Sequence, residues 1–157
     1  MAVSVLFVCL GNICRSPLAE AAFRAEAERL GFDVQVDSAG TGDWHVGRPP
    51  DRRSIAVAAR NGVDIGDLRA RQVSPADFHR FDHIVALDRE NLADLRRMQP
   101  GGAKARLSLL LDHVPGREGD AVADPYHGEE EHFDIAWADA LAGARGLART
   151  IIDAEQA

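Results

Sequence analysis

The 157-residue sequence lacks most features that mark secreted, membrane-bound or nucleic-acid-binding proteins. Its two cysteines, Cys9 and Cys14, are too few for a disulfide framework, and too few for a zinc site unless several histidines join them. No run approaches the roughly 18 apolar residues of a membrane span, and the start of the chain has no signal-peptide pattern. The formal charge of −7 disfavours non-specific nucleic-acid binding, which depends on basic surface. We therefore expect a cytoplasmic protein that binds neither membranes nor nucleic acids.

Length and apolar content indicate a single domain that spans residues 1–157. With 46% hydrophobic residues the chain can bury one good-sized core, but it is too short for two ordinary domains. Three apolar segments predict strands: Val3–Cys9, Phe32–Ala39 and Phe81–Asp88. A fourth segment, Leu107–Leu111, is either a short strand or a buried helical turn.

Helical patterns separate these strands. Ser16 suits the N-cap and Pro17 the first position of a helix whose apolar face continues to Gly31. Further helices are expected between Pro50 and Asn61, around residues 91–95, and from about Phe133 to Ile152. Because consecutive parallel strands need crossover connections, the alternation predicts an α/β fold with a parallel sheet covered by helices on both faces.

Most candidate catalytic and phosphate-binding residues lie in the segment Cys9–Pro17, where the first strand ends and the first helix begins. A loop at such a place directs backbone N–H groups, together with the positive end of the helix dipole, into one concavity that suits a phosphate. The same groups would stabilise a thiolate on Cys9, while Arg15 can bind two phosphate oxygens as a bidentate fork. Gly11 and Asn12 tolerate the left-handed backbone that a loop around an anion demands.

Cys9 also has a simpler interpretation, because a lone cysteine in an apolar strand is usually a buried, space-filling residue. The Cys-x5-Arg-Ser spacing at a strand-to-helix turn favours a nucleophile instead. In that case a hydrogen bond from Ser16 to the thiolate would help the sulfur to leave in a second step.

Two separated motifs resemble those of a known family. The segment Val8–Pro17 resembles the phosphate-binding signature of the low-molecular-weight protein tyrosine phosphatases, and Asp124–Tyr126 resembles their general-acid loop. Val36–Trp44 and Ala70–Gln72 are also similar to family segments, so the resemblance covers nearly the whole chain in order. The family fold is a four-stranded parallel sheet of order 2-1-3-4 with flanking helices, which agrees with the strands expected here.

The resemblance implies an enzyme that hydrolyses phosphotyrosine and aryl phosphates through a cysteinyl-phosphate intermediate, without a metal or other cofactor. Cys9 is then the nucleophile and Arg15 the phosphate clamp. Asp124 is the general acid, because a tyrosyl oxygen leaves more easily as phenol than as phenolate. The same carboxylate would take a proton from the water that hydrolyses the intermediate.

The resemblance also assigns supporting roles around the loop. Ser16 assists the leaving sulfur, and Asn12 forms with Ser38 a hydrogen-bonded pair that holds the shape of the loop. The loop residues that surround the phosphate, Asn12 and Ser16 among them, are expected to bind the substrate: Leu10, Gly11, Asn12, Ile13, Cys14 and Ser16.

The walls of the pocket should select the substrate. Trp44 and Tyr126 are candidates to enclose a phenyl ring, and a deep aromatic slot favours phosphotyrosine over the shorter phosphoserine. Trp44 could instead be a core or lid residue that packs on the glycine-rich segment before it. Many family members carry a second aromatic residue after the position of Tyr126, whereas this chain has His127, which leaves the fine specificity open.

Cys14 and Asp88 each have two interpretations. A loop that curls around a phosphate could bring Cys14 close enough to Cys9 for a disulfide that protects the nucleophile from irreversible oxidation, as is thought for family members with the second cysteine. Alternatively, Cys14 only fills space beneath the loop. Asp88, at the end of the third predicted strand, is either structural or helps to position Arg15.

No metal site is expected. His127 and His132 flank Glu129–Glu131, but an acidic approach to the N-terminus of the last helix explains this pattern better than metal ligation.

Three other functions use similar residues. A thiol-relay arsenate reductase needs a further resolving cysteine, and none follows Cys14. A phosphocysteine carrier has no use for Asp124, and a catalytically silent phosphotyrosine-binding module would be expected to have lost one of the three catalytic residues. We therefore predict a phosphatase of phosphotyrosine proteins, among which a tyrosine kinase could be one. We expect it to be a monomer or a weak homo-oligomer.

Overall fold

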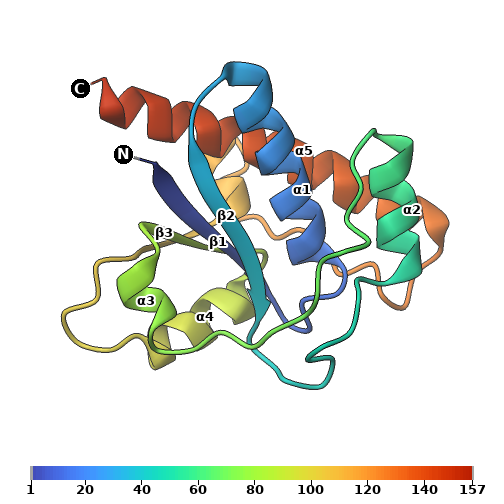
Figure 1. Cartoon of the computed structure of the whole chain (residues 1–157), viewed down its shortest axis with the longest axis horizontal. Helices are drawn as coiled ribbons and strands as arrows, with labels where there is room; N and C mark the ends of the chain where they lie inside the picture. Colours follow the sequence, from blue (N-terminus) through green and yellow to red (C-terminus); the bar gives the residue numbers. More distant parts are fainter. Residues whose placement is uncertain (1, 157) are drawn as a thin grey trace.

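The structure, a computed structural model, describes residues 2–156 and places a parallel sheet between two layers of helices (Figure 1). The four strands are β1 (Val3–Cys9), β2 (Val34–Gly40), β3 (His83–Ala86) and β4 (Arg106–Leu109). The helices are α1 (Arg15–Leu30), α2 (Arg52–Arg60), α3 (Asp77–Arg80), α4 (Arg89–Met98) and α5 (Glu130–Glu155), with a 3-10 helix, η1 (Leu110–His113). The strand order is β2-β1-β3-β4, which confirms the predicted sheet.

Strand β1 is central and is buried on both faces. Its alternate residues Val5 and Phe7 belong to a core shared with α1, α2, α5 and η1, whereas Leu6 and Val8 belong to a second core shared with α3 and α4. A strand covered on both sides needs a continuous apolar run rather than an alternating one, as its sequence has. The prediction of helices on both faces is therefore confirmed.

The chain leaves β1 for β2 on one side and later adds β3 on the other side of β1. In an open parallel sheet such a reversal opens a crevice outside the carboxyl ends of the strands. Cys9 ends β1 and Asp88 follows β3 at this same edge. The topology therefore brings the start of the segment Cys9–Pro17 and the end of the third strand to the same edge of the sheet.

Several predicted boundaries were wrong for local reasons. Helix α1 begins at Arg15 with Cys14 at its N-cap and no side-chain cap, so Ser16 lies inside the helix. Gly31, with a left-handed φ of 72°, ends α1, and the Phe32 N–H still bonds to a helix carbonyl, so β2 begins only at residue 34. The segment 107–111 contains both expected alternatives, a short strand that ends at residue 109 and then the helical turn η1.

The third strand, expected over Phe81–Asp88, is shorter and runs over His83–Ala86, because Phe81 still caps α3 and Asp88 already caps α4. The remaining differences concern helices. Helix α3 was not predicted, and α5 extends beyond both of its expected ends. Among residues 2–156, no helix combines the length and apolar content required to cross a bilayer.

Candidate active site

The segment between β1 and α1 forms a tight loop, here called the phosphate loop (residues 9–15), that packs against the end of β2. Asn12 has a left-handed φ of 58°, the only positive φ among the non-glycine residues that the structure describes. The loop carbonyls of Cys9 and Leu10 accept hydrogen bonds from the backbone N–H groups of residues 41 and 42, both at 2.9 Å. A Cβ at Gly40 would lie 2.8 Å from the Leu10 carbonyl oxygen, so this close approach requires glycine.

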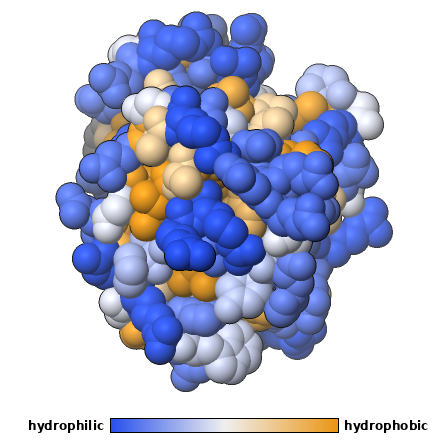
Figure 2. Space-filling view, turned by 90° about the vertical axis from the view of Figure 1, so that its right-hand side faces the viewer, coloured by the Kyte–Doolittle hydropathy of each residue, from blue (hydrophilic) through white to orange (hydrophobic). Residues whose placement is uncertain are grey.

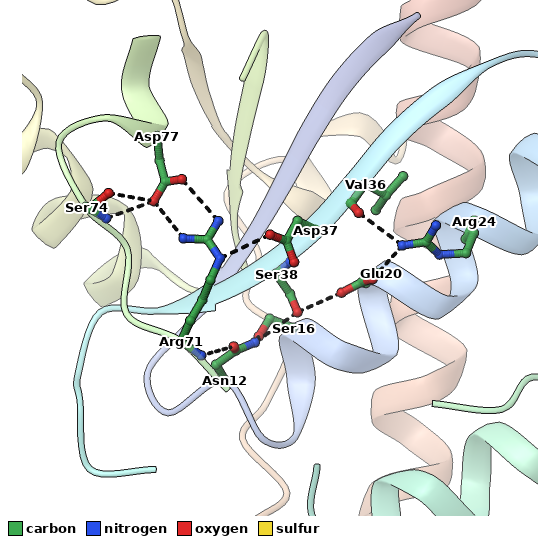
Figure 3. A network of polar contacts seen from close by, with 10 residues as sticks. All are labelled: Asn12, Ser16, Glu20, Arg24, Val36, Asp37, Ser38, Arg71, Ser74 and Asp77. Carbon is green, nitrogen blue, oxygen red and sulfur yellow. Dashed lines mark hydrogen bonds and ion pairs between the residues drawn. The ribbon is translucent and has the colours of Figure 1, made fainter. Parts of the chain in front are cut away.

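The amide of Asn12 organises the interior of the loop (Figure 3). Its Nδ2 group donates to Ser16 Oγ at 2.8 Å and to Ser38 Oγ at 3.0 Å. Since Ser16 Oγ accepts from Asn12, its own proton is free to point at Cys9 Sγ, 3.1 Å away. Ser38 in turn donates to Glu20 Oε1 at 2.8 Å. The Asn12 and Ser38 side chains therefore meet as the family resemblance implied.

The other end of the Asn12 amide connects the loop to Arg71, which sequence reasoning had named only as part of the family-like segment Ala70–Gln72 and had given no role. Asn12 Oδ1 accepts from the backbone N–H of Arg71 at 3.0 Å. The Arg71 guanidinium forms two hydrogen bonds with Asp77, at 3.0 and 3.1 Å, and one with Asp37 at 3.0 Å (Figure 3). Burial disfavours the charge of Arg71, but these carboxylates outweigh it and raise its pKa above the ordinary value. Residues from β2, α3 and the segment before α3 thus support one loop.

Arg15 lies at the end of the loop with only 4% of its side chain exposed. Its Nη1 donates to Asp88 Oδ2 at 2.7 Å and to the Val122 carbonyl oxygen at 3.0 Å, and its Nη2 lies 3.8 Å from Asp124 Oδ2. Burial disfavours the charge, yet the charge interactions with Cys9 and the two aspartates raise the pKa of Arg15 above its usual range. Asp88 also accepts from the Asn91 N–H at 2.7 Å and so caps α4. Asp88 therefore has a structural role, as the cap of α4, and also holds Arg15 in position.

A cavity of about 210 Å³ opens above the loop. Its lining contains the predicted Cys9, Leu10, Gly11, Ile13, Cys14, Arg15, Trp44, Asp124 and Tyr126, together with His45 and His127. Asn12 and Ser16 are not part of the lining, because their side chains point behind the loop. No spacing in the sequence indicated His45, whose only signal was its place next to Trp44.

The aromatic walls lie on two separate segments. Trp44 is 68% exposed, and its ring occupies the space that a side chain at Gly42 would need. It therefore both packs on the glycine-rich segment and lines the cavity. On the opposite segment, the Tyr126 ring lies 6.4 Å from the His45 ring and meets the His127 ring edge-on at 4.9 Å.

Cys14 faces the cavity from the N-cap of α1 and is 4% exposed. Burial, followed by the negative charges of Asp51, Cys9 and Asp124, raises the pKa of the Cys14 thiol to about 12. Both cysteines are free thiols in the structure. Cys14 is thus a protonated thiol close to the nucleophile candidate.

The histidine and glutamate pattern before α5 belongs to the start of that helix. His132 Nδ1 accepts from the Glu129 N–H at 2.9 Å, which satisfies one of the first backbone donors of α5. Within residues 2–156, no three histidine, cysteine, aspartate or glutamate side chains form a group that could hold a metal ion.

Comparison with known proteins gives a consistent result. The family described as "Low molecular weight phosphotyrosine protein phosphatase" matches residues 4–156. The phosphatase of that name from Schizosaccharomyces pombe is 45% identical over 134 residues, which cover 83% of this chain and 85% of the relative. The low molecular weight protein-tyrosine-phosphatase YfkJ of Bacillus subtilis is 45% identical over 127 residues, covering 80% and 81% of the two chains.

Solved structures of protein tyrosine phosphatases have the same fold as this chain. The crystal structure of YfkJ superposes with a TM-score of 0.90 at 39% identity and covers 98% of this chain and 96% of its own. The Entamoeba histolytica protein tyrosine phosphatase superposes with a TM-score of 0.92 at 31% identity, covering 98% and 99%. The chain belongs to the low-molecular-weight phosphotyrosine protein phosphatase family and is a protein tyrosine phosphatase.

Proposed function

We propose that Cys9, Arg15 and Asp124 carry out the dephosphorylation of phosphotyrosine proteins in two steps, without a metal or other cofactor. The observation that supports this assignment is that two segments far apart in the sequence, the phosphate loop with Cys9 and Arg15 and the segment with Asp124, meet at one cavity of about 210 Å³. The phosphate loop and Arg15 supply the positive charge that metal ions supply in many other phosphoryl-transfer enzymes.

In the first step the thiolate of Cys9 attacks phosphorus, and the bond between phosphorus and the tyrosyl oxygen breaks. Asp124 gives its proton to that oxygen, so tyrosine leaves as a neutral phenol. Arg15 binds the equatorial phosphoryl oxygens, and its two contacts with Asp88 and the Val122 carbonyl hold the guanidinium in place.

In the second step a water molecule gives a proton to the Asp124 carboxylate and attacks the phosphorus of the cysteinyl phosphate. The bond between sulfur and phosphorus breaks, and the electron pair returns to Cys9. Ser16 Oγ lies 3.1 Å from the sulfur and is directed there by Asn12, so its proton stabilises the thiolate as it leaves.

The substrate ring lies between the segments that carry Trp44 and Tyr126. Both side chains line the cavity and are partly exposed, which lets them close on a phenyl ring that enters from solvent. His45 and His127 extend the same walls, and His127 stands where many family members carry a second aromatic residue.

The test uses a series of aryl phosphates whose phenols differ in acidity. Asp124→Ala should lower kcat/KM by roughly 10²- to 10⁴-fold for a weakly acidic phenol and far less for an activated ester, because only the former needs a proton to leave. Asp120→Ala is the matched control, since this exposed carboxylate lies four residues earlier on the same segment and outside the cavity. Equal losses across the whole series would show that Asp124 is not the general acid.

A further inference from the structure

Asp124 lies on a segment, residues 114–129, that contains neither helix nor strand. Its side chain is 46% exposed. Its carboxylate accepts a hydrogen bond from the Tyr126 N–H at 3.1 Å and lies 3.8 Å from Arg15 Nη2. The first contact is made within the segment itself, and the second is too long for a hydrogen bond. A general acid needs a fixed place beside the leaving oxygen. On one side of Asp124 the segment is held at Val122, whose carbonyl oxygen accepts from Arg15 Nη1 at 3.0 Å. A second anchor has to hold the segment on the other side.

Arg53, in the first turn of α2, makes the contacts that do this. Its Nη2 donates to the Tyr126 carbonyl oxygen at 2.9 Å, and its Nη1 donates to the Gly128 carbonyl oxygen at 3.2 Å. The guanidinium also lies over the Phe133 ring, 4.4 Å from the ring centre, and 5.9 Å from the centre of the Tyr126 ring. Phe133 is fully buried in α5, so one end of this contact is rigid. Arg53 thereby binds the carbonyls of Tyr126 and Gly128, which follow the Asp124-Pro125 pair, and contacts the helix behind them.

The guanidinium is itself held by Asp51, the N-cap of α2. Asp51 Oδ1 accepts from the Arg53 backbone N–H at 2.9 Å and from Arg53 Nε at 3.0 Å, while Oδ2 accepts from Nη2 at 3.0 Å. Such a two-point pair fixes the plane of the guanidinium as well as its position. The strength of the pair also appears in the pKa of Asp51, which the hydrogen bonds from Arg53 lower below its usual range.

The same turn of α2 contacts the phosphate loop. The backbone N–H of Asp51 donates to the Ile13 carbonyl oxygen at 2.8 Å, and Ser54 Oγ donates to the Cys14 carbonyl oxygen at 3.5 Å. Figure 1 shows α2 beside the start of α5, and Figure 2 shows this side of the molecule, where hydrophilic side chains cover most of the surface. One helical turn therefore connects the loop that carries the nucleophile with the segment that carries Asp124.

We infer that Arg53 is a positioning residue, which sets the distance of Asp124 from the leaving oxygen through the Tyr126 and Gly128 carbonyls. The inference rests on the proposed role of Asp124. Arg53 does not line the cavity and is not expected to contact the substrate.

The experiment compares Arg53→Met with Arg52→Met, using one aryl phosphate with a weakly acidic phenol and one activated ester. Arg52 is the neighbouring residue, is exposed, carries the same charge and makes no hydrogen bond or ion pair with its side chain among the described residues. The measured quantity is kcat/KM, which reports on the steps through expulsion of the phenol. Comparing two substrates on one protein sample removes the effect of any unfolded fraction, because such a fraction lowers both rates by the same factor.

For the ester of the weakly acidic phenol, Arg53→Met should lower kcat/KM by about 10- to 100-fold, since a misplacement of roughly 1 Å can cost about 10²-fold. The activated ester should lose less than about threefold, because its phenolate leaves without a proton. Arg53→Lys should fall between the parent and Arg53→Met, since one ammonium group cannot bind Asp51 and both carbonyls as a fork. Arg52→Met should match the parent on both esters.

A double substitution separates this inference from the proposed function. If Arg53 acts through Asp124, adding Arg53→Met to Asp124→Ala should cause no further selective loss. Equal losses of the two esters in Arg53→Met, or rates that match Arg52→Met, would overturn the positioning role. If instead Asp124→Ala shows no dependence on the leaving group, the proposed function fails.

Discussion

Asn12 offers a test that separates backbone conformation from hydrogen bonding. The residue has a left-handed φ of 58°, and its amide takes part in three hydrogen bonds: two buried ones with Ser16 and Ser38, and a partly buried one with the Arg71 N–H. Asn12→Gly removes the hydrogen bonds but accepts the backbone, whereas Asn12→Ala removes the hydrogen bonds and also strains the backbone. At most positions a glycine variant is less stable than an alanine variant. At position 12 we expect the opposite, with Asn12→Gly more stable than Asn12→Ala.

The magnitudes follow from these contacts. At about 1 kcal/mol for each hydrogen bond, Asn12→Gly should lower the free energy of unfolding by about 3 kcal/mol. Asn12→Ala should lose about 1 kcal/mol more, because a side chain at positive φ costs more than the unfolded-state entropy that alanine saves. For a protein of this size, 1 kcal/mol corresponds to roughly 2–4 °C in Tm. Both variants should also lose about 100-fold in kcat/KM toward aryl phosphates, because the loop no longer holds its donors in place.

The assay is thermal unfolding followed by circular dichroism, with Asn61→Gly and Asn61→Ala as controls. Asn61 ends α2, makes one hydrogen bond to the Val57 carbonyl oxygen, and has a φ of −104°. At Asn61 alanine should therefore be at least as stable as glycine, because glycine has no conformational advantage there. If Asn12→Ala were at least as stable as Asn12→Gly, or if both lay within about 1 kcal/mol of the parent, the proposed support of the loop would be refuted.

Two further predictions concern Cys14. At neutral pH, iodoacetamide should modify Cys9 and spare Cys14, because burial and nearby negative charges raise the pKa of the Cys14 thiol to about 12 and only a thiolate reacts. Labelling of Cys14 should rise only as the pH approaches that value, and equal labelling of both cysteines at neutral pH, measured by peptide mass spectrometry, would contradict this account. Mild peroxide should inactivate the parent reversibly, because it oxidises Cys9 to a sulfenic acid, whose oxygen leaves as water when the neighbouring Cys14 thiol forms a Cys9–Cys14 disulfide. Cys14→Ala should stay active but fail to recover with reductant after peroxide, and its full recovery would exclude a protective role.

The parts of the fold that sequence reasoning captured depend on short-range patterns. The uninterrupted apolar run of β1 indicates a strand buried on both faces, and the cysteine, arginine and serine that follow it indicate an anion-binding turn. Local rules failed where a tertiary contact competed for the same atoms. Ser16 has the sequence context of an N-cap, but its hydroxyl accepts from Asn12 and faces the Cys9 sulfur, so it cannot cap α1.

The supporting contacts were beyond sequence reasoning because they join distant segments. Arg71 is separated from Asn12 by 59 residues, and Arg53 is separated from the Tyr126 carbonyl by 73. Each contact involves a backbone group on one side, which leaves no pattern of residue types in the sequence. His45 similarly lines the cavity only because the segment after β2 folds over the phosphate loop.

In the proposed mechanism the phosphoryl group passes through the sulfur of Cys9. The most direct measurement mixes the enzyme with an aryl phosphate, quenches the reaction within the first turnovers, and locates the added phosphoryl group by peptide mass spectrometry. With an activated ester, Asp124→Ala should accumulate more of the intermediate than the parent enzyme, because this variant lacks the base that activates water in the second step. We predict a phosphoryl group on Cys9 and none in Cys9→Ser, which should also lack turnover because a serine hydroxyl does not ionise near neutral pH. A phosphoryl group on any other residue, or turnover by Cys9→Ser, would contradict the mechanism.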